Sequence, residues 1–210
     1  KGDHCADDSN CMNRYHHAIP SVARANPGDI IVFHTRDALD SDLKFDSVAE
    51  DVTAIDLNLV HPMTGPVYIE GAEPNDVLAI TLVDIEPDEY GYTVIVPGFG
   101  FLRDKYTEPH VVNWRLDRNY AVSEQMPGVQ IPYEAFMGSV GVLPGEAETK
   151  KWLDREARLA EQGGVVLPPQ PIGAQPAAQP CSCRASSRAA ACLSATCITH
   201  KAMARFPAQQ

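Results

Sequence analysis

Short apolar runs, separated by Gly, Pro and polar residues, dominate this chain and predict strands more often than helices. Their lengths, alternation and content of β-branched residues are typical of strands. The predicted strands cover residues 30–34, 67–70, 77–85, 93–96 and 110–116. Residues 55–60 are expected to be a strand or an extended segment. In the strand at 77–85, Val77, Ala79 and Leu82 are expected to face inward.

One segment has the pattern of a helix. Residues 146–162 are charged, contain no Gly or Pro, and place Trp152, Leu153 and Ala157 near one side; Gly163 and Gly164 provide a stop. Many short strands with one helix predict a mainly β fold, with a β-sandwich or barrel-like core and a minor helical part. An α+β arrangement is the alternative.

The composition narrows the classes of partner. The 210 residues include 44% hydrophobic and 21% charged residues, which is typical of a globular chain, and the net charge is −11. This charge disfavours nucleic acid and anionic membrane surfaces, and it is compatible with a small neutral substrate. No apolar run approaches the roughly 18 residues of a membrane span, and no signal peptide is visible. We therefore expect a cytoplasmic protein, and we interpret the start at Lys1 as a truncated start or a fragment.

The six cysteines lie only at the two ends of the chain. Cys5 and Cys11 are near the start, and the others are at positions 181, 183, 192 and 197. A disulfide framework would normally connect the whole fold, so this placement argues against disulfides.

Several polar residues at predicted strand ends and turns are candidates for chemistry. Residues 64–66 and 73–76 are predicted turns, and Glu70 closes the strand between them. Asp37 ends another strand, and His61 precedes Pro62 in an extended segment. Their ordinary roles would be a turn cap or Arg36 partner for Asp37, a solvent-facing strand end for Glu70 and a plain loop histidine for His61. Gly98 and Gly100 could bring backbone N–H groups close to a ligand or form a simple hairpin.

No signature of a covalent nucleophile is present. The chain has no G-x-S-x-G elbow. The pair His16–His17 with His4 and Cys5 invites a metal interpretation, but no ligand spacing supports it, and a surface role is favoured. Asp76 is expected to order its turn. The cofactor is therefore unknown, and a divalent metal is possible without being indicated.

A set of segments, in order along residues 13–178, resembles the acetamidase/formamidase family. It comprises ANPGD at 25–29 with RDA at 36–38, TGPVYIEGAEPND at 64–76, PGFGFL at 97–102, PYEAFMGSVGVLP at 132–144 and GAQPAA at 173–178. The family usually has Gly where this chain has Asn75, and Asn is the next-best residue for a left-handed turn position.

The resemblance implies a homo-oligomeric hydrolase that acts on the C–N bond of short linear amides, converting formamide or acetamide to a carboxylate and ammonia. Glu70, Asp37 and His61 are then the catalytic candidates. Thr64, Gly65, Gly98 and Gly100 are the candidates for substrate binding, with backbone N–H groups near Gly98 and Gly100 as oxyanion donors. The alternative is a truncated, catalytically inactive remnant of the same family, and a third possibility is a β domain that binds a small ligand without turnover.

The last 32 residues have a different composition from the rest. Residues 179–210 contain no Asp or Glu and four Lys or Arg. They could be a basic disordered tail, a zinc site built from the four late cysteines, or an out-of-frame translation. Codons for 191–210, read in a frame shifted by one base, can encode GLSVGDVHYAQGDGEVSGTA, which resembles the family's C-terminal motif. We therefore predict one family-like β-rich domain over 1–178 and an aberrant, out-of-frame, disordered tail over 179–210.

Overall fold

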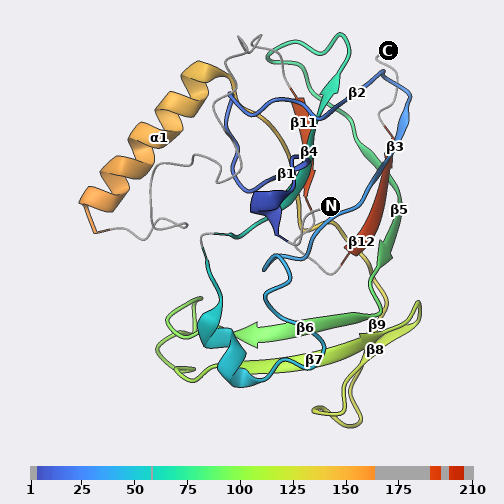
Figure 1. Ribbon diagram of the computed structural model, residues 1–210, viewed down its shortest axis with the longest axis vertical. Coiled ribbons are helices and arrows are strands. Elements are labelled where there is room, and N and C mark those ends of the chain that lie inside the picture. Colours follow the sequence, from blue (N-terminus) through green and yellow to red (C-terminus); the bar gives the residue numbers. More distant parts are fainter. Residues whose placement is uncertain (1–3, 58, 164–189, 195–198, 206–210) are drawn as a thin grey trace.

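The computed structural model describes residues 4–57, 59–163, 190–194 and 199–205, and its elements are mainly strands (Figure 1). The helical elements are η1 (Cys5–Asp7), η2 (Ala49–Ala54) and α1 (Glu146–Glu161). The strands are β1 (Cys11–Met12), β2 (Ala23–Ala25), β3 (Ile30–Phe33), β4 (Met63–Ile69), β5 (Thr81–Pro87), β6 (Tyr90–Ile95), β7 (His110–Leu116), β8 (Tyr120–Val122), β9 (Gln130–Pro132), β10 (Ser139–Val142), β11 (Ala190–Ser194) and β12 (Thr199–Arg205). The predicted mainly β fold with a minor helical part is confirmed.

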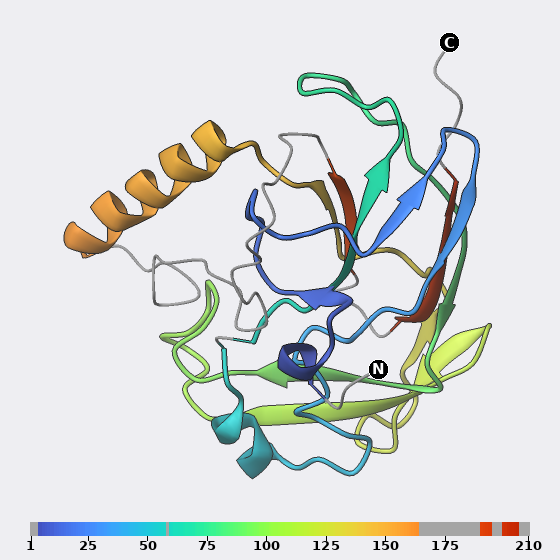
Figure 2. The same ribbon diagram turned by 45° about the horizontal axis from the view of Figure 1, so that its top comes forward.

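The described strands form three sheets. One has the order β1-β4-β11-β10, with β2 also paired to β4; the second is β3-β12-β5; the third is β6-β7-β8-β9. Figure 1 shows the first two in the upper part of the molecule and the third across the lower part, and Figure 2 shows α1 projecting to one side. The β5–β6 connection is short, so the second and third sheets meet where β5 ends at Pro87.

Two segments of the chain's C-terminal part lie inside these sheets. β11 pairs with β4 and β10, and β12 pairs with β3 and β5, all antiparallel. The expected disorder of 179–210 therefore does not describe 190–194 and 199–205, and the other residues of that tail lie outside the described residues. The hydrogen bonds between strands join backbone groups and need no particular side chains. This pairing therefore does not test the out-of-frame origin, which stays a prediction.

Most of the predicted elements are present, with small differences in their ends. The strands predicted at 30–34, 93–96 and 110–116 correspond to β3, β6 and β7, and the helix predicted at 146–162 is α1. Gly163 has φ 78° and its N–H donates to the Ala160 carbonyl, which is the predicted stop. Asn75 has φ 81°, and Asp76 accepts the Glu73 N–H at 2.8 Å, so the predicted turn at 73–76 is confirmed.

Three local predictions were wrong. Residues 64–66 lie inside β4, where Thr64 is in register with Cys11 and the Gly65 N–H donates to the Asn10 carbonyl. Instead of the expected strand or extended segment at 55–60, the Leu59 N–H donates to the Asp56 carbonyl in a turn after η2. Val77 is 92% exposed and Leu82 38% exposed, whereas Leu78 and Ile80 pack against the cluster around Phe33. The strand begins later than predicted, at Thr81, so residues 77–80 precede it and do not follow its alternation.

Three apolar clusters hold these elements together. One joins β2, β3 and β4 around Phe33 and Val67; a second joins Met12, Met63 and Leu143. The third packs Leu39, Leu43 and Val52 against Val111 of β7, with Val60 and the β6 residues at its margin. This third cluster attaches the loop that follows β3, together with η2, to one face of the lower sheet.

The N-terminal segment is closed by a disulfide between Cys5 and Cys11, contrary to the expectation from cysteine placement. The two residues are only six apart, and consecutive turns, with bonds from Asp8 N–H to Cys5 and from Cys11 N–H to Asp8, bring their Cα atoms to 5.2 Å. Such a bridge closes a local loop, which the argument from a molecule-wide framework overlooked.

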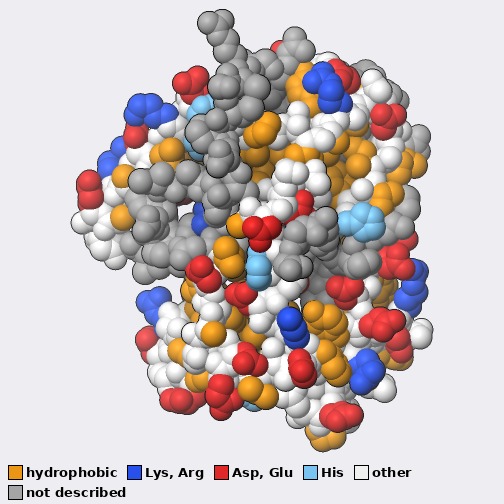
Figure 3. Space-filling view, viewed as in Figure 1, with side chains coloured by type: hydrophobic (Ala, Val, Ile, Leu, Met, Phe, Trp, Pro, Cys, Tyr) orange, Lys and Arg blue, Asp and Glu red, His pale blue; other side chains and the backbone are white. Residues whose placement is uncertain are grey.

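The surface agrees with the acidic composition. Figure 3 shows red carboxylate side chains scattered over the lower part of the molecule, with orange apolar areas between them. In the described part of the chain, no helix is both long and apolar enough to cross a membrane.

Candidate active site

A pocket of about 660 Å³ lies where the end of β6 meets the connection before β4. We call it the His61 pocket. Two of the predicted site residues, His61 and Gly100, line it. The other lining residues are Leu39, Leu57, Val60, Val94, Ile95, Val96, Phe99, Phe101, Leu102 and Tyr106. This is the described cavity that brings predicted site residues together, so it is the candidate site.

His61 is the ionisable imidazole of this pocket. It is exposed at the pocket mouth, and the protein around its ring withdraws enough water to lower its pKa from the ordinary value. The positive charge of Arg14 lowers the pKa further. Arg14 is held close by a hydrogen bond from its guanidinium to the Val60 carbonyl, at 2.9 Å. His61 is therefore neutral at pH 7 and can accept a proton.

Residues 99–102 also line the pocket, and the predicted site residue Gly98 precedes them without lining it. Gly98 has φ 79° and Gly100 has φ 88°, conformations that favour glycine, and the Phe99 N–H donates to the Val96 carbonyl at 3.0 Å to close the turn between them. The Gly100 N–H donates to no acceptor among the residues that the structure describes. Because Gly100 lines the pocket, this N–H is a candidate donor there.

Tyr106 and Lys105 complete the rim. Tyr106 lines the pocket, and the Lys105 ammonium lies over its ring at 5.5 Å from the centroid.

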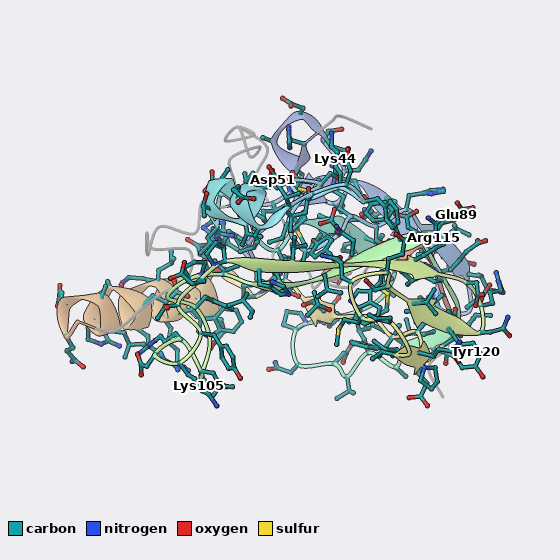
Figure 4. The ribbon with its side chains drawn as sticks, turned by 90° about the horizontal axis from the view of Figure 1, so that it is seen from below. Lys44, Asp51, Glu89, Lys105, Arg115 and Tyr120 are labelled. Carbon is teal, nitrogen blue, oxygen red and sulfur yellow. A yellow bond between two sulfur atoms is a disulfide. The ribbon has the colours of Figure 1, made fainter. Side chains whose placement is uncertain are left out.

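Figure 4 shows Lys105 and Tyr120 near opposite ends of the lower sheet. A second pocket of about 270 Å³, which includes Tyr120 and Trp114, is therefore separate from the His61 pocket.

Asp37 organises the loop beside the pocket and does not line it. Its Oδ1 accepts hydrogen bonds from the Tyr92 hydroxyl at 2.6 Å and the Leu39 N–H at 2.9 Å, and its Oδ2 accepts the Ser41 N–H at 2.7 Å. Burial, followed by the Asp37 charge, raises the pKa of Tyr92 far above its ordinary value, so the phenol stays protonated as the donor. Asp37 thus caps a turn and fixes Leu39, which is a pocket residue.

Glu70 lies away from the pocket, at the end of β4. Its two carboxylate oxygens accept hydrogen bonds from Arg24, from Nε at 2.5 Å and from Nη2 at 2.9 Å, and both side chains are open to solvent. The bidentate pair raises the pKa of Arg24. Arg24 thus engages both oxygens of the carboxylate that the sequence offered as a catalytic candidate.

Thr64 and Gly65 hold β4 in place near His61. The Thr64 hydroxyl donates to the His34 carbonyl at 2.7 Å, and the Gly65 N–H donates to the Asn10 carbonyl at 2.9 Å. Neither residue lines the His61 pocket. Their contacts fix the strand that follows His61.

The sequence did not reveal a buried ion network beside this region. Asp40 is fully buried and accepts hydrogen bonds from Arg36 at 2.9 Å and from the Cys5 N–H at 2.6 Å, and Arg36 also contacts Asp8 at 3.1 Å. The sequence had offered Arg36 as a partner of Asp37, but it is paired with the residues at +4 and in the disulfide loop instead. Because partners 28 and 35 residues away complete the network, local spacing could not show it.

The described residues contain no group of His, Cys, Asp or Glu side chains that could hold a metal ion. His16 and His17 stack on each other with ring centroids 4.5 Å apart, and Cys5 is in the disulfide. The zinc alternative for the four late cysteines involves residues whose side chains lie outside the description.

Comparison with known proteins decides the family. The sequence profile of the Acetamidase/Formamidase family matches residues 2–201. The chain belongs to the acetamidase/formamidase family. It is 31% identical over 170 residues to an acetamidase of Mycolicibacterium smegmatis, covering 75% of this chain and 42% of that protein. A formamidase of Methylophilus methylotrophus is 29% identical over 168 residues, covering 77% of this chain and 41% of its own length.

The chain thus spans about two fifths of the length of these family relatives. Among solved structures, it resembles a gamma lactamase from Delftia acidovorans with a TM-score of 0.82 and 22% identity, over 97% of this chain and 65% of that chain. An acetamidase from Bacillus halodurans gives a TM-score of 0.66 with 20% identity, over 95% and 68%. At these identities the structural likeness supports the fold of the family.

Proposed function

We propose that this chain contributes to hydrolysis of the C–N bond of carboxamides, which yields a carboxylate and ammonia. The observation that carries the proposal is a neutral, proton-accepting His61 in an apolar pocket of an acetamidase/formamidase family member. The family relatives are named for acetamide and formamide, so these two amides are the first substrates to assay.

His61 is proposed as the general base. Its imidazole takes a proton from a water molecule, whose oxygen bonds to the amide carbonyl carbon, and the carbonyl oxygen becomes an oxyanion. The Gly100 N–H donates to that oxyanion. The imidazolium then gives its proton to the leaving nitrogen as the C–N bond breaks. The products are ammonia and a carboxylic acid, which ionises.

His61→Gln tests this assignment. The variant keeps a polar side chain of similar reach but cannot take the proton, so we expect ammonia release to fall by about 10²-fold or more. Glu70→Gln is the matched comparison. If Glu70 is the base, as the sequence suggested, this variant loses activity while His61→Gln keeps it, and the proposal for His61 fails.

The same assay addresses the inactive alternative. One outcome is that the folded chain releases no ammonia from formamide, acetamide or any larger amide. That result would contradict the proposed hydrolysis and favour the remnant or binding-only alternatives. Assembly as a homo-oligomer is part of the proposal, because the family resemblance implies it, and the cytoplasmic location expected from the sequence is also part of it. Light scattering after size-exclusion chromatography checks the assembly.

A further inference from the structure

The His61 pocket is much larger than the amides for which the family is named. Its volume of about 660 Å³ lies within the range of about 300–1,000 Å³ that holds drug-sized ligands. A water molecule has roughly 30 Å³ of liquid volume, so formamide or acetamide, with three or four heavy atoms, occupies roughly 100 Å³. A short amide would therefore leave most of the cavity to water.

The lining of the pocket is also unsuited to that water. Nine of its twelve lining residues are Leu, Val, Ile or Phe, and none is Asp, Glu, Lys or Arg. At the mouth, Phe99 is 54% exposed, Leu102 61% exposed and Phe101 fully exposed. Exposed apolar residues gathered around one concave site are typical of a surface that buries an apolar ligand.

The polar groups of the pocket are few and suffice for one amide. His61 and the Gly100 N–H provide a proton acceptor and a donor, and Tyr106 provides a hydroxyl. An acyl group attached to an amide at these polar groups would contact the apolar side chains that make up the rest of the lining. The remaining lining offers that acyl group no hydrogen-bonding side chain.

We propose that the His61 pocket selects carboxamides with a large apolar acyl group, such as a six-carbon chain or an aromatic ring, over formamide and acetamide. This inference rests on the proposed hydrolysis for its turnover, and on the size and lining of the pocket for its selectivity. Each buried methylene is worth about a fourfold gain in affinity, so selectivity is expected to rise steadily with acyl length until the pocket is filled.

The first experiment compares kcat/KM for acetamide, butanamide, hexanamide and benzamide, measured as ammonia release. We expect a rise of about fourfold for each added methylene, with benzamide near hexanamide. Phe99→Ala removes part of the apolar wall, and it should lower the hexanamide-to-acetamide ratio of kcat/KM by about tenfold. Phe136→Ala is the matched control: its ring is 62% exposed and lines the other pocket, so the ratio should stay at the wild-type value.

A binding experiment separates this inference from the proposed reaction. Thermal unfolding of His61→Gln is followed with benzamide and with acetamide at equal millimolar concentrations, and only benzamide should raise the midpoint. Binding of benzamide without ammonia release from any amide would refute the reaction and keep the selectivity. Turnover of acetamide equal to that of hexanamide would keep the reaction and overturn the selectivity. If none of these amides is bound or hydrolysed, both proposals are overturned.

Discussion

The surroundings of His61 determine the pH at which its imidazole gains a proton. Partial withdrawal of the ring from water and the neighbouring Arg14 charge both lower its pKa below the ordinary value of 6.5. The unfolded chain therefore binds this proton at a higher pH than the folded chain does. Stability contributed by the neutral imidazole is complete above about pH 6.5 and is lost as the pH falls through the folded pKa.

Arg14→Gln tests the electrostatic part of this effect. Removing the positive charge should raise the pKa of His61 while leaving it below its ordinary value, because the protein around the ring still withdraws water from it. The measurement is an NMR titration of the His61 ring proton, assigned by its absence in His61→Gln. Arg14→Lys keeps the charge and should titrate close to wild type. An unchanged midpoint in Arg14→Gln would show that Arg14 does not act on His61.

For single residues, sequence patterns indicated candidate side chains but not the partners that each side chain contacts. His61 and Gly100 were offered as candidates in separate segments, and the structure shows that both line one pocket. Glu70 was chosen because a carboxylate follows an apolar strand, but its neutralising partner is Arg24, 46 residues away. The hydrogen bond between Asp37 and Tyr92 spans 55 residues. Partners so far apart in sequence become neighbours only through the folded sheets.

The strands of the chain's last part have a larger role in the fold than their composition suggested. β12 lies between β3 and β5, and Ala202 is in register with Phe33 on one side and Ile85 on the other. β11 similarly lies between β4 and β10. Composition and periodicity could not predict these strands, because ladder hydrogen bonds depend on the backbone. The inward positions predicted at 77–83 failed for another reason: residues 77–80 precede β5, and side-chain alternation applies only within a strand.

Ala202→Pro tests whether β12 supports the molecule. Proline removes one N–H from a central strand and leaves a carbonyl acceptor on a neighbouring strand unpaired, so the free energy of unfolding should fall by about 2 kcal/mol or more. Urea titration measures this loss, and hydrogen exchange should show faster exchange in β3 and β5. Ala202→Ser keeps the N–H and is expected to retain the wild-type exchange pattern. Equal stability of the two variants would mean that the tail adds nothing to the sheets, as an out-of-frame segment is expected to behave.

At the scale of the whole molecule, the site and the core share residues. Leu39, Val60, Val94 and Val96 belong to the apolar cluster around Leu43, and the same four residues line the His61 pocket. The pocket wall is therefore the outer side of the cluster that attaches the post-β3 loop and η2 to the lower sheet. The other clusters, around Phe33 and Met12, have no residue in that wall.

This sharing predicts different consequences for two equally buried residues. Leu43 and Met12 are both fully buried, so Leu43→Ala and Met12→Ala should each lower the free energy of unfolding by about 2–5 kcal/mol. Only Leu43→Ala leaves a cavity behind the pocket wall, and it alone should weaken the binding of benzamide, by several-fold at a temperature where both variants are folded. Calorimetric titration measures the affinities and urea unfolding the stabilities. Equal loss of affinity in both variants would show that binding follows overall stability, and that the cluster around Leu43 does not shape the pocket.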